Sequence, residues 1–166
     1  MRRLGAAWTL LVTLWFFSVV KPVSAGSDED AIRQLLNKWA QAFRAHDVNA
    51  IMAMYAPDVV AYDIAPPLQY IGADSYKRDY VEFLNGYDGP VETEMRDLRI
   101  VVDGNLAVAM CLERMSGTLK SGQKSDIWVR VTSCFRKVNG KWLDFHDHVS
   151  TPTDFATGKS LIDLKP

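Results

Sequence analysis

Cysteine and histidine are scarce in this sequence, which has two cysteines and three histidines among 166 residues. Neither Cys111 nor Cys134 has the spacing of a metal site, so a metal-stabilised domain is not expected. Both lie in segments that we expect to be strands. There they either pair across a hairpin as a disulfide or remain buried free thiols.

An excess of positive charge is also missing, because 19 basic residues face 20 acidic ones. No basic stripe follows any predicted element, which argues against nucleic acid as the main partner. The sequence has no internal repeat, no low-complexity tract and no linker. Its length suits one globular domain and leaves no room for two ordinary ones.

Long apolar runs are confined to the N-terminus. Arg2 and Arg3 precede the uncharged run Leu4–Val20, and small residues follow at Val23-Ser24-Ala25. This order predicts a signal peptide over residues 1–25, cleaved after Ala25, and a periplasmic or secreted domain over 26–166. An uncleaved membrane anchor is the alternative, but the run is short for a bilayer span. After cleavage we expect no membrane association.

Helical periodicity dominates the start of the remaining chain. The spacing of apolar residues predicts a helix over 28–46, with Ser27 as its N-cap. Asp47 is expected to cap a second, short helix that continues to Tyr55 and is stopped by Pro57. The apolar positions of the first helix are Ile32, Leu35, Leu36, Trp39 and Phe43.

A third helix is expected over 75–85, and the rest of the chain shows strand and turn signals. Helices followed by a run of antiparallel strands indicate an α+β domain rather than a βαβ arrangement. A strongly curved sheet packed against three helices leaves a conical gap, which is a natural ligand cavity. The predicted strands are 59–63, 91–102, 105–118, 125–138 and 141–151.

Several short segments together, by their order and spacing, indicate a known family. They are Trp39-Ala40-Gln41-Ala42-Phe43, His46-Asp47, Tyr55-Ala56-Pro57-Asp58, Tyr62-Asp63, Pro66-Pro67, Gly72, Arg130-Val131-Thr132, Asn139-Gly140-Lys141-Trp142, His146-Asp147-His148-Val149-Ser150, Pro152-Thr153-Asp154-Phe155 and Thr157-Gly158-Lys159. They resemble the SnoaL-like and ketosteroid-isomerase-like domains of the NTF2-like superfamily, over nearly all of residues 28–166. The resemblance implies a cone-shaped α+β fold with one pocket for a small apolar or carbonyl-bearing molecule, and a homodimer; we expect no metal and no cofactor.

Asp63 is the main catalytic candidate. It is the last residue of a predicted strand and precedes the apolar run Ile64-Ala65-Pro66-Pro67. Such surroundings desolvate a carboxylate, which raises its pKa and makes it a better proton acceptor near neutral pH. The resemblance places Asp63 where ketosteroid isomerases carry their general base. The alternative is a carboxylate that only caps its own turn.

Trp39 departs from the isomerase pattern. The resemblance puts it where those enzymes carry a tyrosine that donates a hydrogen bond to the developing enolate. An indole N–H is a donor but is not acidic, so steroid isomerisation itself is not expected. Aromatic side chains are nevertheless expected to form the pocket wall, or else plain core. These are Trp39, Tyr55, Phe83 and Trp128, and Tyr62 is a further candidate for binding the ligand.

Polar residues occupy alternate positions along the last predicted strand. Period-two alternation predicts that His146, His148 and Ser150 share one face with Trp142 and Asp144. We interpret these three residues as pocket lining, with His148 as the catalytic partner of Asp63. A metal site would need Asp144 as third ligand, and histidines satisfied by the backbone are the further alternative.

Arg130 shares a strand face with Trp128 and is a candidate for binding a ligand carboxylate. It could also balance Asp63 or Glu113, and structural pairing is the more frequent use of such an arginine.

Three functions remain open from the sequence. The first is a proton-transferring isomerase or lyase that uses Asp63 as base. The second is an association module, because the strand Gly140-Lys141-Trp142 to Ser150 also resembles the association domain of calcium/calmodulin-dependent kinases. The third is a carrier that binds a ligand without turnover. Fold alone does not choose among them.

Overall fold

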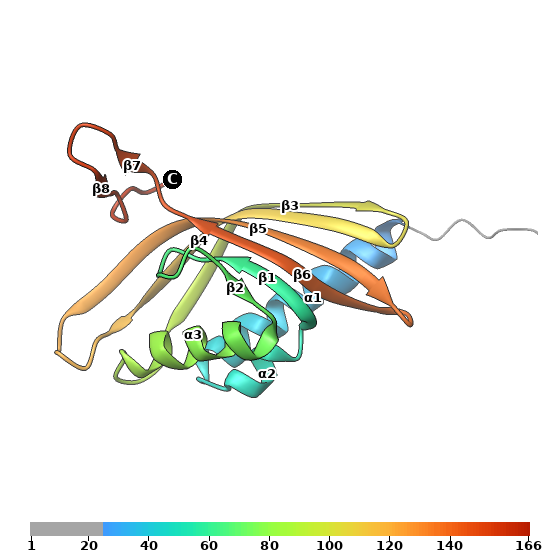
Figure 1. The fold of residues 1–166 in the computed structure, drawn as a ribbon, viewed down its shortest axis with the longest axis horizontal. Coiled ribbons are helices and arrows are strands. Elements are labelled where there is room, and N and C mark those ends of the chain that lie inside the picture. Colours follow the sequence, from blue (N-terminus) through green and yellow to red (C-terminus); the bar gives the residue numbers. More distant parts are fainter. Residues whose placement is uncertain (1–24) are drawn as a thin grey trace, which may run out of the picture.

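A computed structural model describes residues 25–166, and the predicted signal peptide lies outside this range apart from its last residue. Helices come first and long strands follow, which confirms the α+β class (Figure 1). Among residues 25–166, no helix has the length and apolar character needed to cross a membrane. The elements are α1 (Ala25–Arg44), α2 (Val48–Met52), β1 (Tyr55–Tyr62), β2 (Tyr70–Ile71), α3 (Ala73–Asn85), β3 (Glu92–Asp103), β4 (Leu106–Thr118), β5 (Lys124–Val138), β6 (Lys141–Ser150), β7 (Thr153–Asp154) and β8 (Lys159–Ser160).

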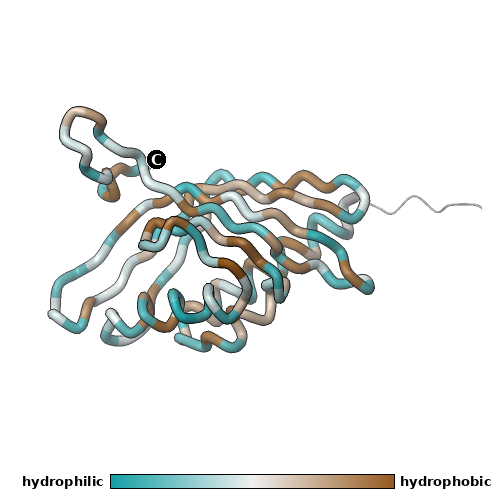
Figure 2. Tube along the Cα trace, viewed as in Figure 1, coloured by the Kyte–Doolittle hydropathy of each residue, from teal (hydrophilic) through white to brown (hydrophobic). Residues whose placement is uncertain are grey.

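Six strands form one sheet in the order β2-β1-β6-β5-β4-β3. All neighbours are antiparallel except β1 and β6, which run parallel. The three helices lie along one face of this curved sheet, and β7 and β8 form a separate hairpin that projects from it (Figure 1). Apolar and polar residues alternate along the long strands (Figure 2), so that one face packs against the helices.

Helix α1 packs through the apolar stripe that its spacing predicts, with Ile32, Leu36, Trp39 and Phe43 buried. The predicted N-terminus is wrong, because the helix begins at Ala25 and Ser27 lies within it.

Asp28 is buried and ties α1 to the sheet. Its carboxylate pairs with the Lys137 ammonium of β5 and accepts a hydrogen bond from Trp142 Nε1 of β6 at 3.1 Å. This ion pair lowers the pKa of Asp28. Asp28 therefore makes a tertiary contact that joins α1 to β5 and β6.

Asp47 caps α2 as predicted, since its carboxylate accepts a hydrogen bond from the Ala50 N–H at 3.0 Å. The predicted end of this helix is wrong. It stops at Met52, and both Tyr55 and Pro57 belong to β1. Proline fits there because the register of β1 against β6 is irregular between Tyr55 and Val60, where no regular ladder hydrogen bond is required.

The long meander follows the predicted strands within one or two residues. Its β5–β6 turn has positive φ angles at both Asn139 (50°) and Gly140 (78°). That conformation suits the twist of a two-residue hairpin, and Asn-Gly is the pair that tolerates it best.

One extra residue in β6 changes which side chains face the helices. Cys134 pairs with His146 and the next residue, Phe135, pairs with Asp144, so Phe145 has no partner. Asp144 accepts a hydrogen bond from the His146 N–H at 3.0 Å across this bulge. Because a bulge shifts the two-residue alternation, the predicted shared face of residues 142, 144, 146, 148 and 150 is wrong. Before the bulge the buried residues of β6 have even numbers, Trp142 and Asp144, and after it the buried residue is Asp147.

Cys111 and Cys134 are both free and half-buried. Cys111 pairs in register with Val131, whereas Cys134 pairs with Val108. Since Val108 and Cys111 are an odd number of residues apart on β4, the two thiols lie on opposite faces of the sheet. The disulfide alternative is therefore wrong.

The C-terminal segment returns to the edge of the long hairpin. Leu161 donates a backbone hydrogen bond to Pro152, and Trp128 of β5 donates one to Ile162 at 3.1 Å. Lys165 pairs with Asp126 at 3.0 Å. These contacts bring the tail against the outer side of β5, and the β7–β8 hairpin itself stands clear of the sheet (Figure 1).

Phe135 tests the core beneath the first half of α1, where it is fully buried with Ile32, Leu36 and Trp142. We expect Phe135→Ala to lower the free energy of unfolding by about 3–5 kcal/mol in urea denaturation, because it leaves a cavity. Val138→Ala on the same strand is the control, and its exposed side chain should cost less than about 0.5 kcal/mol. Equal losses for the two variants would contradict this core.

The burial of Asp144 at the bulge can be tested through the pH dependence of the protein's stability. It is fully buried, and burial together with the nearby Asp147 charge raises its pKa well above the usual range. A raised folded-state pKa means that this group costs stability as pH rises above its unfolded pKa of about 4. Asp144→Asn removes that cost and retains an oxygen acceptor for His146. We expect the variant to gain stability relative to the wild type between pH 4 and pH 7, measured by urea denaturation.

The matched control for this experiment is Asp58→Asn. Arg136 lowers the pKa of the exposed Asp58, so its charge adds stability above the unfolded pKa rather than removing it. This variant should show no gain over the same pH range. A stability difference for Asp144→Asn that stays constant with pH would refute the prediction.

Candidate functional site

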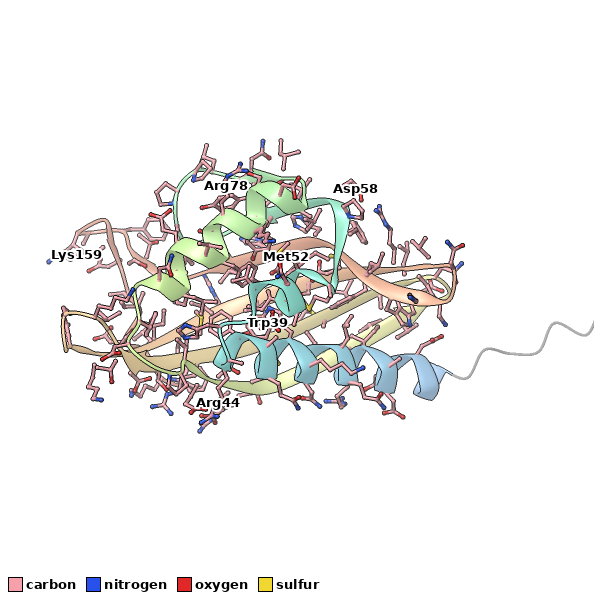
Figure 3. The ribbon with its side chains drawn as sticks, turned by 90° about the horizontal axis from the view of Figure 1, so that it is seen from below. Trp39, Arg44, Met52, Asp58, Arg78 and Lys159 are labelled. Atoms are coloured by element: carbon pink, nitrogen blue, oxygen red, sulfur yellow. The ribbon has the colours of Figure 1, made fainter. Side chains whose placement is uncertain are left out.

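A cavity of about 360 Å³ lies between the helices and the inner face of the sheet. α1, α3, the start of β1 and the loop after β1 form one wall, and β3 to β6 form the other. Figure 3 shows Trp39 on the side of α1 that is turned toward α2 and α3, whereas Asp58, Arg78 and Lys159 lie at the periphery. The aromatic lining consists of Trp39, Phe43, Tyr55, Tyr76, Tyr80 and Phe83.

Three of the sequence-predicted site residues reach this cavity: Asp63, Trp39 and Tyr55. Asp63 follows β1 directly and is half-buried there. Trp39 stacks on Phe43 of the same helix, with ring centroids 4.9 Å apart. The predicted strand-end position therefore does bring the Asp63 carboxylate to the pocket.

His146, His148 and Tyr62 lie together on the outer face of the sheet. The Tyr62 ring centroid lies 4.9 Å from that of His146 and 5.8 Å from that of His148. His146 Nδ1 is 2.8 Å from the Val60 carbonyl oxygen. The prediction that His148 shares the cavity with Asp63 is wrong, because the bulge at Phe145 turns both histidines outward.

Trp128, Arg130 and Ser150 are also outside the cavity, so their prediction as lining residues is wrong. Trp128 lies beneath the Arg96 guanidinium, 5.3 Å from the ring centroid. Arg130 donates a hydrogen bond to the Thr151 carbonyl at 3.0 Å and is paired in register with Ser150. The neighbours Val129 and Val131 line the cavity instead, since they occupy the alternate strand positions.

A chain of hydrogen bonds crosses the floor of the cavity. Trp39 Nε1 donates to the Tyr80 hydroxyl at 3.2 Å, and the Tyr80 and Tyr55 hydroxyls are 2.6 Å apart. The Tyr55 hydroxyl donates to Asp147 Oδ2 at 3.2 Å. Since Tyr55 donates its single proton to Asp147, it can only accept from Tyr80, so the Tyr80 hydroxyl donates to Tyr55 and the whole series of donors points at Asp147.

Tyr76 joins the two carboxylates of the site. Its hydroxyl lies 3.1 Å from Asp63 Oδ2 and 3.1 Å from Asp147 Oδ2. Ser133 donates to the other Asp147 oxygen at 2.8 Å. A phenol has one proton, so Tyr76 donates to one carboxylate at a time and couples their hydrogen bonding.

Burial controls the ionisation of this cluster. It raises the pKa of Asp63, although the Ile64 N–H at 2.6 Å and the Tyr76 hydroxyl oppose the shift. It also raises the pKa of Asp147, and the Asp63 charge adds to the effect. A carboxylate with a raised pKa is a stronger proton acceptor, which is the property a general base requires.

Glu113 on β4 is the most isolated carboxyl of the cavity. It is 5% exposed, and burial with the Asp147 and Asp63 charges raises its pKa to about 8. Within the described part of the chain, no hydrogen bond reaches this carboxyl. At the rim, Tyr70 donates to Asp79 at 2.8 Å, and burial raises the pKa of Asp79 to about 6.

Sequence reasoning missed Asp147, Tyr76, Tyr80 and Ser133 as site residues. The signal for the two tyrosines was present, since they are four residues apart on one face of a predicted helix. The alternation pattern puts Asp147 on the strand face opposite the two histidines and so leaves it out of the predicted pocket, because a bulge leaves no mark in that pattern. Across residues 25–166 no group of three or more His, Cys, Asp or Glu side chains could hold a metal ion.

Comparison with known proteins gives a family and a fold. The SnoaL-like domain model matches residues 32–154. An NTF2-like protein of unknown function from Pseudomonas putida KT2440 is 35% identical, with a TM-score of 0.77, over 85% of this chain and 98% of that one. A search of curated proteins gave no significant match.

More distant structures agree on the fold alone. An NTF2-like superfamily protein from Salmonella enterica is 17% identical with a TM-score of 0.72, over 83% of this chain and all of that one (100%). A ketosteroid isomerase-like protein from Erwinia carotovora is 18% identical with a TM-score of 0.64, over 75% and 96%. The cone-shaped α+β arrangement expected from the sequence is thereby confirmed. The chain belongs to the SnoaL-like domain family of the NTF2-like superfamily.

Proposed function

We propose that the cavity binds a small, largely apolar molecule and that Asp63 acts on it as a general base. The observation that carries this proposal is a carboxylate with a raised pKa at the rim of an aromatic cavity, held by one tyrosine hydroxyl. Aromatic and aliphatic walls with a few convergent polar groups are typical of ligand sites.

The chemistry is a proton transfer. Asp63 takes a proton from a C–H group of the bound molecule, and the C–H electron pair remains on that molecule. Return of the proton to another carbon gives an isomerase, and loss of a leaving group gives a lyase. Tyr76 keeps Asp63 Oδ2 in place and links it to Asp147, which takes the position in the site that the sequence assigned to His148.

Trp39 does not act as the oxyanion donor in this proposal, because its N–H is already used by Tyr80. Tyr76 is the hydroxyl that can turn to a ligand oxygen, because two carboxylates share its one proton, whereas Tyr55 and Tyr80 already donate along the chain to Asp147. Hydroxyl donors fixed in a buried site stabilise developing charge without reorganisation.

Asp63→Asn tests the base. We expect kcat/KM for isomerisation or elimination to fall about 10²–10⁴-fold over a panel of cyclic ketones and hydroxy compounds, with binding retained. The wild-type rate should decline as pH falls through the raised pKa of Asp63, since protonation removes the base. His148→Gln, on the outer face, is the matched control and should keep wild-type activity. Binding by the wild type without turnover of any compound would favour a carrier instead.

The outer face of the sheet supports a second proposal, a homodimer. Four large apolar side chains are exposed on the outward positions of β3, β4 and β5, and neighbouring exposed apolar groups on a sheet favour association. They are Val101 (58% exposed), Leu106 (56%), Met110 (38%) and Val138 (42%).

Light scattering on the purified domain tests this second proposal. We expect a dimer for the wild type and a monomer for the double variant Val101→Glu, Met110→Glu, because two buried charges would face each other across the interface. Leu68→Glu is the control, since Leu68 is 95% exposed on the loop before β2 and away from that face. A wild type that stays monomeric at high concentration would rule out the dimer.

A further inference from the structure

Five acidic side chains line the cavity, and they come from four different parts of the fold. Asp63 follows β1, Asp79 and Glu82 come from α3, Glu113 from β4 and Asp147 from β6. Among the described residues that line the cavity, none is lysine, arginine or histidine. The cavity therefore combines an apolar wall with acidic groups and no basic one.

Some carboxylates outside the cavity have cationic partners. Ion pairs between described residues serve Asp28, Asp58, Glu92 and Asp126, with Arg44, Arg114 and Lys137 among their partners. None of the ion pairs within residues 25–166 uses a cavity carboxyl. The cavity thus gathers five acidic groups without one basic partner among the described residues.

Among the cavity carboxyls, Glu113 is the buried one that lacks both an ion-pair and a hydrogen-bond partner among the described residues. Its side chain is almost entirely buried, faces the cavity and receives no hydrogen bond from any described residue. Burying an acidic group without a partner costs free energy, so such a group persists where something outside the chain satisfies it. Asp147 differs, because Ser133 and the tyrosines already donate to it.

The aromatic rings add a second attraction for positive charge. The face of a tryptophan, tyrosine or phenylalanine ring carries negative potential, and a cation within about 6 Å of a ring is stabilised, most strongly where water is excluded. Trp39 and Phe43 on α1 stand across the cavity from Glu113 and Met115 on β4, and Tyr55 and Tyr80 complete the wall between them. A positively charged group inside would thus meet both ring faces and carboxylates.

We propose that the ligand of this cavity is an organic cation, an apolar molecule that carries one amine or quaternary ammonium group. This inference rests on the proposed function, in which the cavity binds a small molecule. An anionic ligand would find only acidic groups and no basic partner in the cavity, and a bare metal ion is disfavoured because no described residues form a metal-binding group. In a proton transfer, the positive nitrogen of the ligand would offset the negative charge that Asp63 generates.

Two probes of equal shape test the charge alone. 4-(Trimethylammonio)phenol and 4-tert-butylphenol differ in a quaternary nitrogen that replaces a carbon, and calorimetry measures both dissociation constants. We expect the wild type to bind the cation at least about tenfold more tightly, the ratio that one cation–aromatic or charge contact supplies in a desolvated site.

A bound cation favours the ionised form of the adjacent Glu113 carboxyl, so Glu113→Gln should reduce that ratio severalfold and leave binding of 4-tert-butylphenol unchanged. Glu82→Gln, at an exposed position on the cavity rim, should reduce it in the same direction and does not threaten folding. Glu94→Gln is the matched control, because Glu94 is paired with Arg96 outside the cavity and its loss should not change the ratio.

The outcomes separate this inference from the proposed function. Equal or tighter binding of 4-tert-butylphenol, or an unchanged ratio in both cavity variants, overturns the organic cation and leaves the small-molecule pocket in place. Failure of both probes to bind at millimolar concentration overturns the two together.

Discussion

The unpaired residue Phe145 in β6 is the constraint on which the site depends. By shifting the alternation of one central strand, it sends Asp147 into the cavity and both nearby histidines out of it. The bulge is held by the Asp144 carboxylate, which accepts the His146 N–H within the same strand. Bulges re-aim side chains at little cost to the rest of a sheet, and here the effect decides the chemistry of the pocket.

Once Asp147 points inward, the helices satisfy it. Tyr76 and Tyr80 are one turn apart on α3, so their hydroxyls reach the same region, and Tyr55 at the start of β1 lies between them and the carboxylate. Buried polar groups of this kind are stable only when they are satisfied together, because each lost partner leaves another group unpaired. The network therefore fixes the position of α3 against the sheet as well as the geometry of Asp63.

The cavity differs from the surface in how charge is balanced. On the surface, carboxylates such as Asp126 and Glu92 have arginine partners, and such exposed pairs contribute little stability. In the cavity, carboxyls are brought together without a cation, and burial, together with their mutual repulsion, raises their pKa values. This imbalance makes the empty site unfavourable and a positively charged occupant favourable.

Much of this protein is determined locally and follows from the sequence. The apolar stripe of α1, the Asp47 cap and the Asn139-Gly140 turn each depend on a few neighbouring residues, and they predict helices before an antiparallel meander. Asp63 was also predictable, since a strand end followed by an apolar, proline-containing loop places a carboxylate at the edge of the core.

The tertiary structure decided which other residues join Asp63. Whether His148 or Asp147 faces the cavity depends on one unpaired residue, and the alternation of polar and apolar residues in the sequence is compatible with either phase. The lack of a partner for the Glu113 carboxyl likewise depends on how β4, β6 and α3 pack together, because this packing decides which side chains surround it. Local hydrogen bonds and the periodicity of apolar residues depend on residues close together in the sequence. Strand register and the burial of carboxyl groups depend on segments that meet only in the folded protein.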